Sequence, residues 1–299
     1  MIYPSSICTG ASPALFGISE AKVLPMVELL DAMAVEQIDT NFFRGKLQHR
    51  TALVRTFGGE VAARALAAGS AGMPAGFKVH SIHGYFVRST ASEIPIDYLV
   101  DTVKHGRSFA VRRIRAVQHG RETFLMVASF HVGDRGVRHA DACPETPGPE
   151  QLARIGVGDA GNEWEGWDIR PVPDSTIGAA RQQVWLRYTG ELPDCPVTHS
   201  CALTYASDMT LLGAAVALHP GIAIQTAALD YSIWFMRPYR VDDWLLYDEI
   251  SPSAGAGRAF TQGRIFSRTG ELVAMVAQER MLRLAEPGFG HSLVDRAAS

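Results

Sequence analysis

The feature that most limits the fold of this chain is an internal repeat. A strand-like run that ends in aromatic-x-Arg occurs twice, at residues 79–88 and 228–237. A Gly-Arg-x-Phe motif follows each run, at Gly106, 18 positions after the end of the first, and at Gly257, 20 positions after the end of the second. Motifs repeated in the same order at similar spacing indicate two copies of one structural unit.

Each Gly-Arg-x-Phe motif begins a β-like segment that leads into a tight turn and then into an apolar strand. The turns are expected at His119–Gly120 and at Thr269–Gly270, because glycine adopts the positive φ that tight connections need. The apolar strands follow at 124–130 and 272–278. Both halves are therefore predicted to contain hairpins of antiparallel strands.

A long helical segment precedes these strands in each half. Residues 57–69 are rich in alanine and end at a glycine, and residues 205–218 are similarly apolar and end before His219-Pro220. Their small apolar faces suit burial. A leading amphipathic helix is also expected at 19–34. The pattern predicts an α+β fold with two antiparallel sheets, each wrapped around a long central helix.

A segment with little periodicity separates the two halves. Residues 134–178 are rich in proline, glycine and charge, and they include Cys-Pro-Glu-Thr-Pro-Gly-Pro-Glu at 143–150. This composition is typical of a connector. We therefore expect an N-terminal module with its leading helix at 1–140, a connector at 141–178 and a C-terminal module at 179–299.

Composition and charge argue against several classes of protein. A chain of 299 residues with 47% hydrophobic residues can bury two cores of ordinary size. Its net charge of -3 argues against a nucleic-acid partner. It contains no apolar run of 18 residues and no secretory signal, which argues against a membrane span and against secretion. Its four cysteines form no CxxC pair, so reduced thiols in the cytoplasm are expected.

Two carboxylates stand at matching positions in the predicted helices. Glu60 follows Phe57 by three positions, and Asp208 follows Tyr205 in the same way. Unpaired N–H groups and the macrodipole favour a carboxylate in the first turn of a helix, so capping alone would explain either acid. The functional alternative is a carboxylate at the mouth of a buried helix that orients and deprotonates a water molecule.

The histidines His80 and His83 invite a metal interpretation, which their spacing disfavours. Side chains three positions apart on a strand point to opposite faces and cannot readily share one ion. We therefore expect neither a metal nor a cofactor.

Several short motifs occur in an order and at spacings that one known family shares. They are Arg44-Gly45, Arg55-Thr-Phe-Gly-Gly59, His80-Ser-Ile-His-Gly-Tyr-Phe86, Gly106-Arg-Ser-Phe109, Tyr205-Ala-Ser-Asp208, Leu229-Asp230 with Trp234-Phe235, Trp244-Leu-Leu-Tyr247 and Val276-Ala-Gln-Glu279. As an ordered set from about residue 41 to 283, they closely resemble the acyl-CoA thioesterase II family. The resemblance implies a double hotdog fold and hydrolysis of acyl-CoA to free fatty acid and CoA without a covalent intermediate. It also allows copies of the chain to associate.

The active site of that family positions the attacking water with an Asp, a Thr or Ser, and a Gln. By resemblance, the Asp is Asp208 and the Gln is Gln278. A thioester carbonyl is electrophilic enough for a water molecule polarised by a carboxylate and an amide. No Gly-x-Ser-x-Gly motif is present in the sequence, so a serine nucleophile of that type is not indicated.

The sequence departs from the family at the hydroxyl-bearing position. Ala228 stands where the family has Thr or Ser. Thr226 would share its face of a strand, displaced by about 6–7 Å along it. A second departure is Glu60, where the family has Gln, and it adds a carboxylate at the pseudo-symmetric site.

These departures leave three interpretations open. Asp208 and Gln278 hydrolyse thioesters with weaker positioning of water, helped by Thr226 if its strand shifts. Alternatively, Glu60 acts as the base in the other module. The third alternative is an acyl-CoA-binding protein of the same fold with weak or no catalysis. A hydratase acting on enoyl-CoA is less consistent, because hotdog hydratases carry a His five residues after the Asp and Gly213 stands there.

Overall fold

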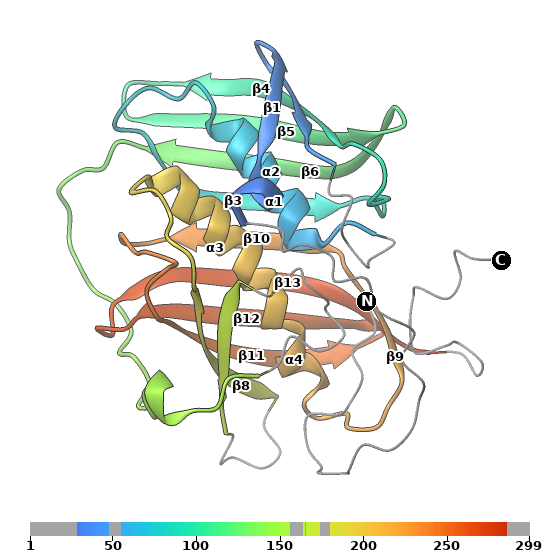
Figure 1. Ribbon diagram of the computed structural model, residues 1–299, viewed down its shortest axis with the longest axis vertical. Coiled ribbons are helices and arrows are strands. Elements are labelled where there is room, and N and C mark those ends of the chain that lie inside the picture. The colour runs from blue at the N-terminus through green and yellow to red at the C-terminus, as the bar shows by residue number, and fades with distance from the viewer. Residues whose placement is uncertain (1–28, 48–54, 156–163, 165, 174–179, 286–299) are drawn as a thin grey trace.

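The computed structural model describes residues 29–47, 55–155, 164, 166–173 and 180–285, which include 13 paired strands (Figure 1). The first half contributes β1 (Val35–Asp39), β2 (Phe42–Gly45), β3 (Lys78–Phe86), β4 (Asp97–His105), β5 (Phe109–Gln118) and β6 (Arg121–His131). The second half contributes β7 (Trp167–Val172), β8 (Arg181–Tyr188), β9 (Ile224–Ala228), β10 (Asp230–Phe235), β11 (Leu245–Gly255), β12 (Arg258–Ser267) and β13 (Leu272–Leu284).

All of these strands belong to one antiparallel sheet. Its order is β1-β2-β4-β5-β6-β3-β10-β13-β12-β11-β8-β7, and β9 pairs with β13. The halves meet where β3 pairs with β10, with His83 opposite Ser232. The prediction of two separate sheets is therefore wrong. The edge strand of a sheet has unpaired backbone N–H and C=O groups. Here the edge strands of the two halves pair with each other, so these groups find partners.

The hairpin turns of both halves lie where the repeat places them. His119 and Gly120 both have positive φ, at 52° and 69°, between β5 and β6. Two consecutive residues of this conformation suit a tight hairpin connection. Gly270, with φ of 84°, lies in the matching turn between β12 and β13.

One of the two long predicted helices is displaced in the structure. Helix α2 spans Gly58–Ser70, within one residue of the predicted 57–69. The second forms α3 (Pro196–Thr210) followed by α4 (Leu212–Val216), so it begins nine residues before the predicted start at 205. Pro196 explains the earlier start, because proline at the first helical position is already set in the helical φ.

Helices α2 and α3 pack side by side on one face of the sheet (Figure 1). Their contact is close at Gly59, where an added Cβ would lie 2.5 Å from the carbonyl oxygen of Tyr205. The ring of Tyr205 meets that of Phe57 edge-on, with centroids 5.1 Å apart. The helix pair thus brings the starting residues of α2 against the C-terminal half of α3.

Only the end of the predicted leading helix lies in the described part of the chain. Helix α1 spans Leu29–Met33, and residues 19–28 of the predicted 19–34 lie outside the described residues. Among the helices that the structure describes, none combines the length and apolarity that a bilayer crossing requires.

The predicted connector contains regular structure. A short 3₁₀ turn (Pro149–Gln151) precedes β7, which pairs with β8 at the edge of the sheet. Trp167 of β7 is 2% exposed and packs edge-on against Tyr188. This part of the segment therefore belongs to the core, which its loop-like composition did not indicate.

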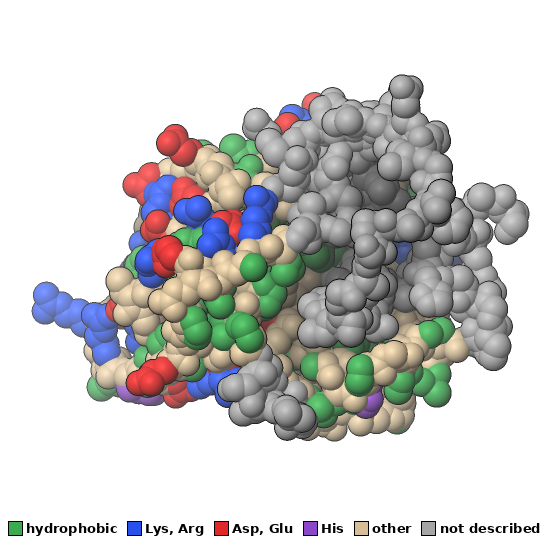
Figure 2. Space-filling model, turned by 60° about the horizontal axis from the view of Figure 1, so that its bottom comes forward, with side chains coloured by type: hydrophobic (Ala, Val, Ile, Leu, Met, Phe, Trp, Pro, Cys, Tyr) green, Lys and Arg blue, Asp and Glu red, His purple; other side chains and the backbone are tan. Residues whose placement is uncertain are grey.

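Charged side chains of both signs lie intermingled on the left of the described face in Figure 2, next to an area of mostly hydrophobic and other side chains. On the first half of the sheet, Arg44 and Asp97 lie 2.6 Å apart, and Arg113 and Asp101 lie 2.8 Å apart. Exposed pairs of this kind contribute little to stability, typically about 0–1 kcal/mol each. They do leave fewer unpaired positive charges on these strands.

Candidate active site

Asp208 lies in the last turn of α3, so the expectation that it caps the start of its own helix is wrong. The residue is buried, with 4% of its surface exposed. At the C-terminal end of a helix the macrodipole disfavours a negative charge. A buried carboxylate in this position therefore needs partners from other elements.

Gln278 of β13 is the first of these partners. Its amide Nε2 donates a hydrogen bond of 2.9 Å to Asp208 Oδ1, and the side chain is fully buried. The neighbouring strand holds the backbone here, because Thr261 of β12 donates its hydroxyl to the carbonyl oxygen of Gln278 at 3.1 Å. The structure thus brings together the carboxylate and the amide that the sequence assigned to one site.

Arg280 is a second partner, which the interpretation of the sequence missed. It follows Gln278 by two positions on β13, so both side chains point to the same face. Its Nε donates to Gln278 Oε1 at 2.5 Å, and its Nη2 forms an ion pair with Asp208 Oδ1. Arg280 is 3% exposed. The sequence did contain a signal for this partner: a basic residue in a mostly apolar strand, two positions after a candidate catalytic amide. A charge in such a strand is expected to be buried, and buried charges are normally paired.

The other oxygen of the Asp208 carboxylate faces the start of α2. A Cβ added to Gly58 would lie 2.8 Å from Asp208 Oδ2. The first N–H groups of a helix have no acceptor within the helix, and its dipole favours negative charge there. Asp208 therefore lies at the unfavourable end of its own helix and at the favourable end of its neighbour.

Ala228 and Thr226 lie on β9, beside the Asp208 cluster. In the register with β13, Ala228 is opposite Arg280 and Thr226 is opposite Leu282. Residues paired in this way project on one face, so Ala228 borders the guanidinium group. Thr226 is buried and shares this face, but it lies two residue pairs along the ladder from the Ala228–Arg280 pair. The register keeps the Thr226 hydroxyl displaced from the position that the family hydroxyl would take.

Glu60 occupies the first turn of α2, as expected, and lies in a separate environment. Its Oε1 is 2.7 Å from Nη1 of Arg64, one helical turn later, and both residues are buried. The hollow that Glu60 and Arg64 line measures about 10 Å³. This is room for about one water molecule and too little for a thioester.

Tyr231 forms hydrogen bonds with the last turns of α3, next to Asp208. Its hydroxyl donates to the carbonyl oxygen of Thr204 at 2.9 Å and also bonds the hydroxyl of Ser207. Burial raises the pKa of Tyr231 well above its ordinary value, so the phenol remains neutral. A neutral, hydrogen-bonded anchor fixes the helix turn that carries the carboxylate.

Comparison with known proteins matches both halves of the chain to one kind of enzyme. The family described as acyl-CoA thioesterase matches residues 172–281, and the acyl-CoA thioesterase N-terminal domain matches residues 48–131. Acyl-coenzyme A thioesterase 8 of Mus musculus is 31% identical over 289 residues, which cover 87% of this chain and 90% of the relative. Acyl-CoA thioesterase 2 of Haemophilus influenzae is 32% identical over 282 residues, covering 86% and 98%.

Solved structures show the same similarity. The acyl-CoA thioesterase II TesB2 from Mycobacterium marinum superposes with a TM-score of 0.78 at 44% identity, covering 87% of this chain and 99% of that one. A hot dog fold protein from Alicyclobacillus acidocaldarius has a TM-score of 0.73 at 20% identity, covering 86% and 98%. At that identity the second comparison shows the fold alone.

Proposed function

Because the chain belongs to the acyl-CoA thioesterase II family, we propose that it hydrolyses acyl-CoA thioesters to free fatty acid and CoA, using water that Asp208 activates. The observation that carries this mechanism is the hydrogen bond from Gln278 to Asp208 Oδ1, inside a buried cluster that also contains Arg280. No covalent intermediate and no metal take part in the proposed reaction.

In this mechanism Asp208 Oδ2 accepts the proton of the attacking water. Gln278 and Arg280 hold Oδ1, which leaves Oδ2 directed toward the start of α2. The water oxygen bonds to the thioester carbon as its proton passes to the carboxylate. The C–S bond then breaks, and the leaving sulfur of CoA takes that proton. N–H groups at the start of α2 are placed to stabilise the oxyanion that forms between these steps.

Arg280 is a positioning residue in this scheme. By donating to Gln278 Oε1, it fixes the orientation of the amide, so that the NH₂ end of Gln278 points to Asp208. The methyl side chain of Ala228, opposite Arg280, leaves room for the guanidinium group. In the family, a hydroxyl at the position of Ala228 helps to position the attacking water. Here Arg280 takes over part of that role by orienting the amide.

Acyl-CoA binding with little turnover is the second candidate function. Both candidate bases, Asp208 and Glu60, share their charge with a buried arginine. The hydroxyl that helps to position water in the family is absent at Ala228. A chain with these changes could retain the binding surface of the fold after losing its catalytic rate.

Thiol release from short, medium and long acyl-CoA substrates by the full-length protein tests both functions. We expect turnover of at least one substrate, a kcat at least about 100-fold lower for D208N, and an unchanged kcat for E60Q. Saturable binding without thiol release would establish the second function. Loss of activity in E60Q, with D208N unaffected, would move the base to Glu60. Thermal unfolding of each variant checks that it is folded.

We also propose that each half is a hotdog module, at 1–140 and 179–299, with its part of the sheet wrapped around its helix.

Cys143, Cys195 and Cys201 are free thiols, which supports a reducing compartment such as the cytoplasm. Association of copies stays a prediction, and size-exclusion chromatography with light scattering tests it.

A further inference from the structure

Five exposed basic side chains gather at one corner of the sheet. Lys104 and Arg107 lie at the β4–β5 turn, Lys78 begins β3, and Arg135 and Arg138 follow the end of β6. In the described part of the chain, none of the five has a carboxylate within ion-pair distance. Because the whole chain carries a net charge of -3, this corner is a local reversal of the overall charge.

The strand register brings one row of side chains together at this corner. Lys78 is opposite His131, and His131 is opposite Phe109. The rings of Phe109 and His131 stack, with centroids 4.1 Å apart. The next pair along this ladder, Ala110 and Phe130, is buried in the core. The row that contains Phe109 therefore projects from the opposite face of the sheet, away from the helices.

Lys104 lies on this same face, beside the β4–β5 turn. It is opposite Val111, which follows Phe109 by two positions on β5. Arg107 lies within the turn itself, where the backbone N–H of Gly106 donates to the carbonyl oxygen of Phe109 at 2.9 Å. The turn therefore keeps both cations within a few residues of the Phe109 ring.

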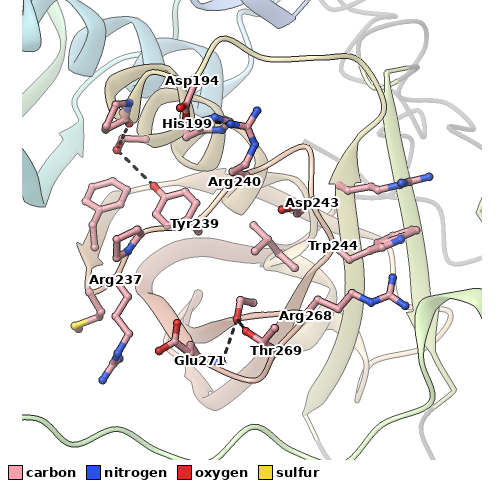
Figure 3. A pocket seen from close by; sticks show the side chains of 18 of the residues that line it. Asp194, His199, Arg237, Tyr239, Arg240, Asp243, Trp244, Arg268, Thr269 and Glu271 are labelled. Atoms are coloured by element: carbon pink, nitrogen blue, oxygen red, sulfur yellow. Dashed lines mark hydrogen bonds and ion pairs between the residues drawn. The ribbon is translucent and has the colours of Figure 1, made fainter.

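The segment after β6 continues the corner and is held at both of its ends. The backbone N–H of Val132 donates to the carbonyl oxygen of Ser108 in the β4–β5 turn, at 3.2 Å. At the other end, Nη2 of Arg237 donates to the carbonyl oxygen of His139 at 3.1 Å. Figure 3 shows the Arg237 side chain extending away from the pocket that it borders at the start of α3. Residues 132–138 between these anchors are all exposed, so the two arginines of this segment face solvent.

Apolar side chains are interleaved with these cations. Four of them are exposed: Val103 by 63%, Phe109 by 44%, Val132 by 39% and Val137 by 96%. Val103 directly precedes Lys104, and Val137 directly precedes Arg138. A single exposed apolar residue is common, but four of them among unpaired cations form a surface that is both apolar and basic.

A bilayer with anionic headgroups is the partner that matches both properties. Lipid phosphates attract lysine and arginine, and apolar side chains on protruding turns enter the boundary between headgroups and acyl chains. A folded protein partner would pack on a continuous apolar area, whereas cations separate the apolar side chains here. Nucleic acid would use the cations alone and would leave the valines in water.

We propose that this basic corner docks on an anionic lipid surface. The basic corner consists of Lys78, Lys104, Arg107, Arg135 and Arg138 with Val103, Phe109, Val132 and Val137. Its cations meet the lipid phosphates, and its apolar side chains enter the headgroup region.

The basic corner is separate from the candidate active site. Arg112 of β5, three residues after Phe109, donates to the carbonyl oxygen of Gly69 at 2.8 Å, so the corner adjoins the C-terminal end of α2. Asp208 faces Gly58 at the other end of that helix, about 18 Å away by the rise per residue. Docking therefore does not involve the Asp208 cluster, and it does not depend on the proposed hydrolysis.

Co-sedimentation of the full-length protein with lipid vesicles tests the proposal. The vesicles contain phosphatidylcholine alone, or phosphatidylcholine with about 30% phosphatidylglycerol, whose headgroup is anionic. We expect about tenfold stronger partitioning to the anionic vesicles in about 0.1 M NaCl, and loss of this preference in about 0.5 M NaCl, because salt screens the attraction. Lys104→Glu with Arg107→Glu should weaken that partitioning about tenfold, and Val137→Ser about threefold.

Arg121→Glu with Arg283→Glu is the matched control. It changes the charge of the chain by the same amount at two exposed arginines outside the basic corner, and Arg121 begins β6 at the end opposite His131. We expect this variant to keep its partitioning within about twofold. Thermal unfolding checks that every variant is folded, and Lys104→Gln with Arg107→Gln replaces the charge reversal if that variant unfolds.

Four results would overturn the proposal. They are equal partitioning to neutral vesicles, no partitioning to either kind, unchanged partitioning in K104E/R107E, and a comparable loss in R121E/R283E, which would indicate an effect of overall charge. Two other occupants would each replace the bilayer. Binding of duplex DNA that K104E/R107E abolishes, without vesicle binding, would assign the corner to nucleic acid. Dissociation of a dimer by the same variant, seen by light scattering without vesicle binding, would assign it to a second copy of the chain.

Discussion

The carboxylate of Asp208, in the second half of the repeat, lies against Gly58, the first residue of the long helix in the first half. A Cβ on Gly58 would come within 2.8 Å of Asp208 Oδ2. The candidate base and the helix start that faces it therefore belong to different halves of the chain. Neither half contains this arrangement alone, so the β3–β10 junction and the α2–α3 packing are prerequisites for the site.

Gly58→Ala tests the importance of that contact. The added methyl group would force the carboxylate of Asp208 to move, and small misplacements of catalytic groups can lower rates about 100-fold. We expect kcat for acyl-CoA to fall about 10- to 100-fold, with little loss of stability because alanine favours helix formation. Gly136→Ala, where a Cβ meets nothing within 4 Å, is the control. A folded G58A protein with the wild-type kcat would show that the contact is not needed.

The role of Arg280 can be tested together with its neighbour Ala228. We expect Arg280→Ala to lower kcat about 100-fold while KM changes less than about threefold, because the amide of Gln278 loses its orientation. Ala228→Thr should bring no gain in the wild-type protein, where the guanidinium group fills the space opposite. In the R280A background the same change should raise kcat at least about fivefold by restoring a hydroxyl.

Ala227→Thr in the R280A background is the matched control for this rescue. Ala227 pairs with Met281, so its side chain lies on the opposite face of β9 from the site. Equal rescue by A227T and A228T, or none by A228T, would reject the positioning role. Removing one partner of a buried ion pair can cost about 3–5 kcal/mol, so thermal unfolding must accompany each assay.

The sequence predicted those parts of the site that local patterns encode. Gly58-Gly59 after Phe57 and the alanine-rich run placed α2 within one residue. The repeat with α2 predicts a start for α3 that is too late. Pro196 is the local signal for the true start of this helix. The Arg280–Asp208 pair joins residues 72 positions apart on a strand and a helix, and no local pattern specifies that contact. The β3–β10 junction is likewise a tertiary pairing.

Close packing of the helix pair predicts a large effect on stability at Gly59. A Cβ there would lie 2.5 Å from the carbonyl oxygen of Tyr205, which is backbone and cannot rotate away. We expect Gly59→Ala to lower the free energy of unfolding by about 1–3 kcal/mol, as overpacking does, despite the higher helix propensity of alanine. Urea unfolding against the G136A protein measures the difference. An unchanged midpoint would mean that α2 and α3 can separate without cost.

Glu249 predicts a pH dependence of stability that is independent of catalysis. This residue of β11 is fully buried, and its carboxyl group accepts hydrogen bonds from the side chains of Thr210 and Gln182. Burial raises the pKa of Glu249 from 4.5 to about 8, because desolvation disfavours the charged form. The neighbouring carboxylate of Asp248 acts in the same direction.

The sign of the effect follows from proton binding in the two states. Between pH 4.5 and about 8 the folded protein keeps a proton on Glu249 that the unfolded chain has lost, so stability falls as pH rises through this window. Glu249→Gln keeps the shape and can still bond Thr210 and Gln182, but it does not titrate. We expect E249Q to match the wild type near pH 4.5 and to exceed its free energy of unfolding at pH 8.5, by an amount on the order of 5 kcal/mol. Urea unfolding at both values measures this, with the exposed Glu93→Gln as control. If the wild-type and E249Q curves run parallel across this pH range, Glu249 does not carry the proton in the folded state, because only a titration confined to one protein can make them diverge.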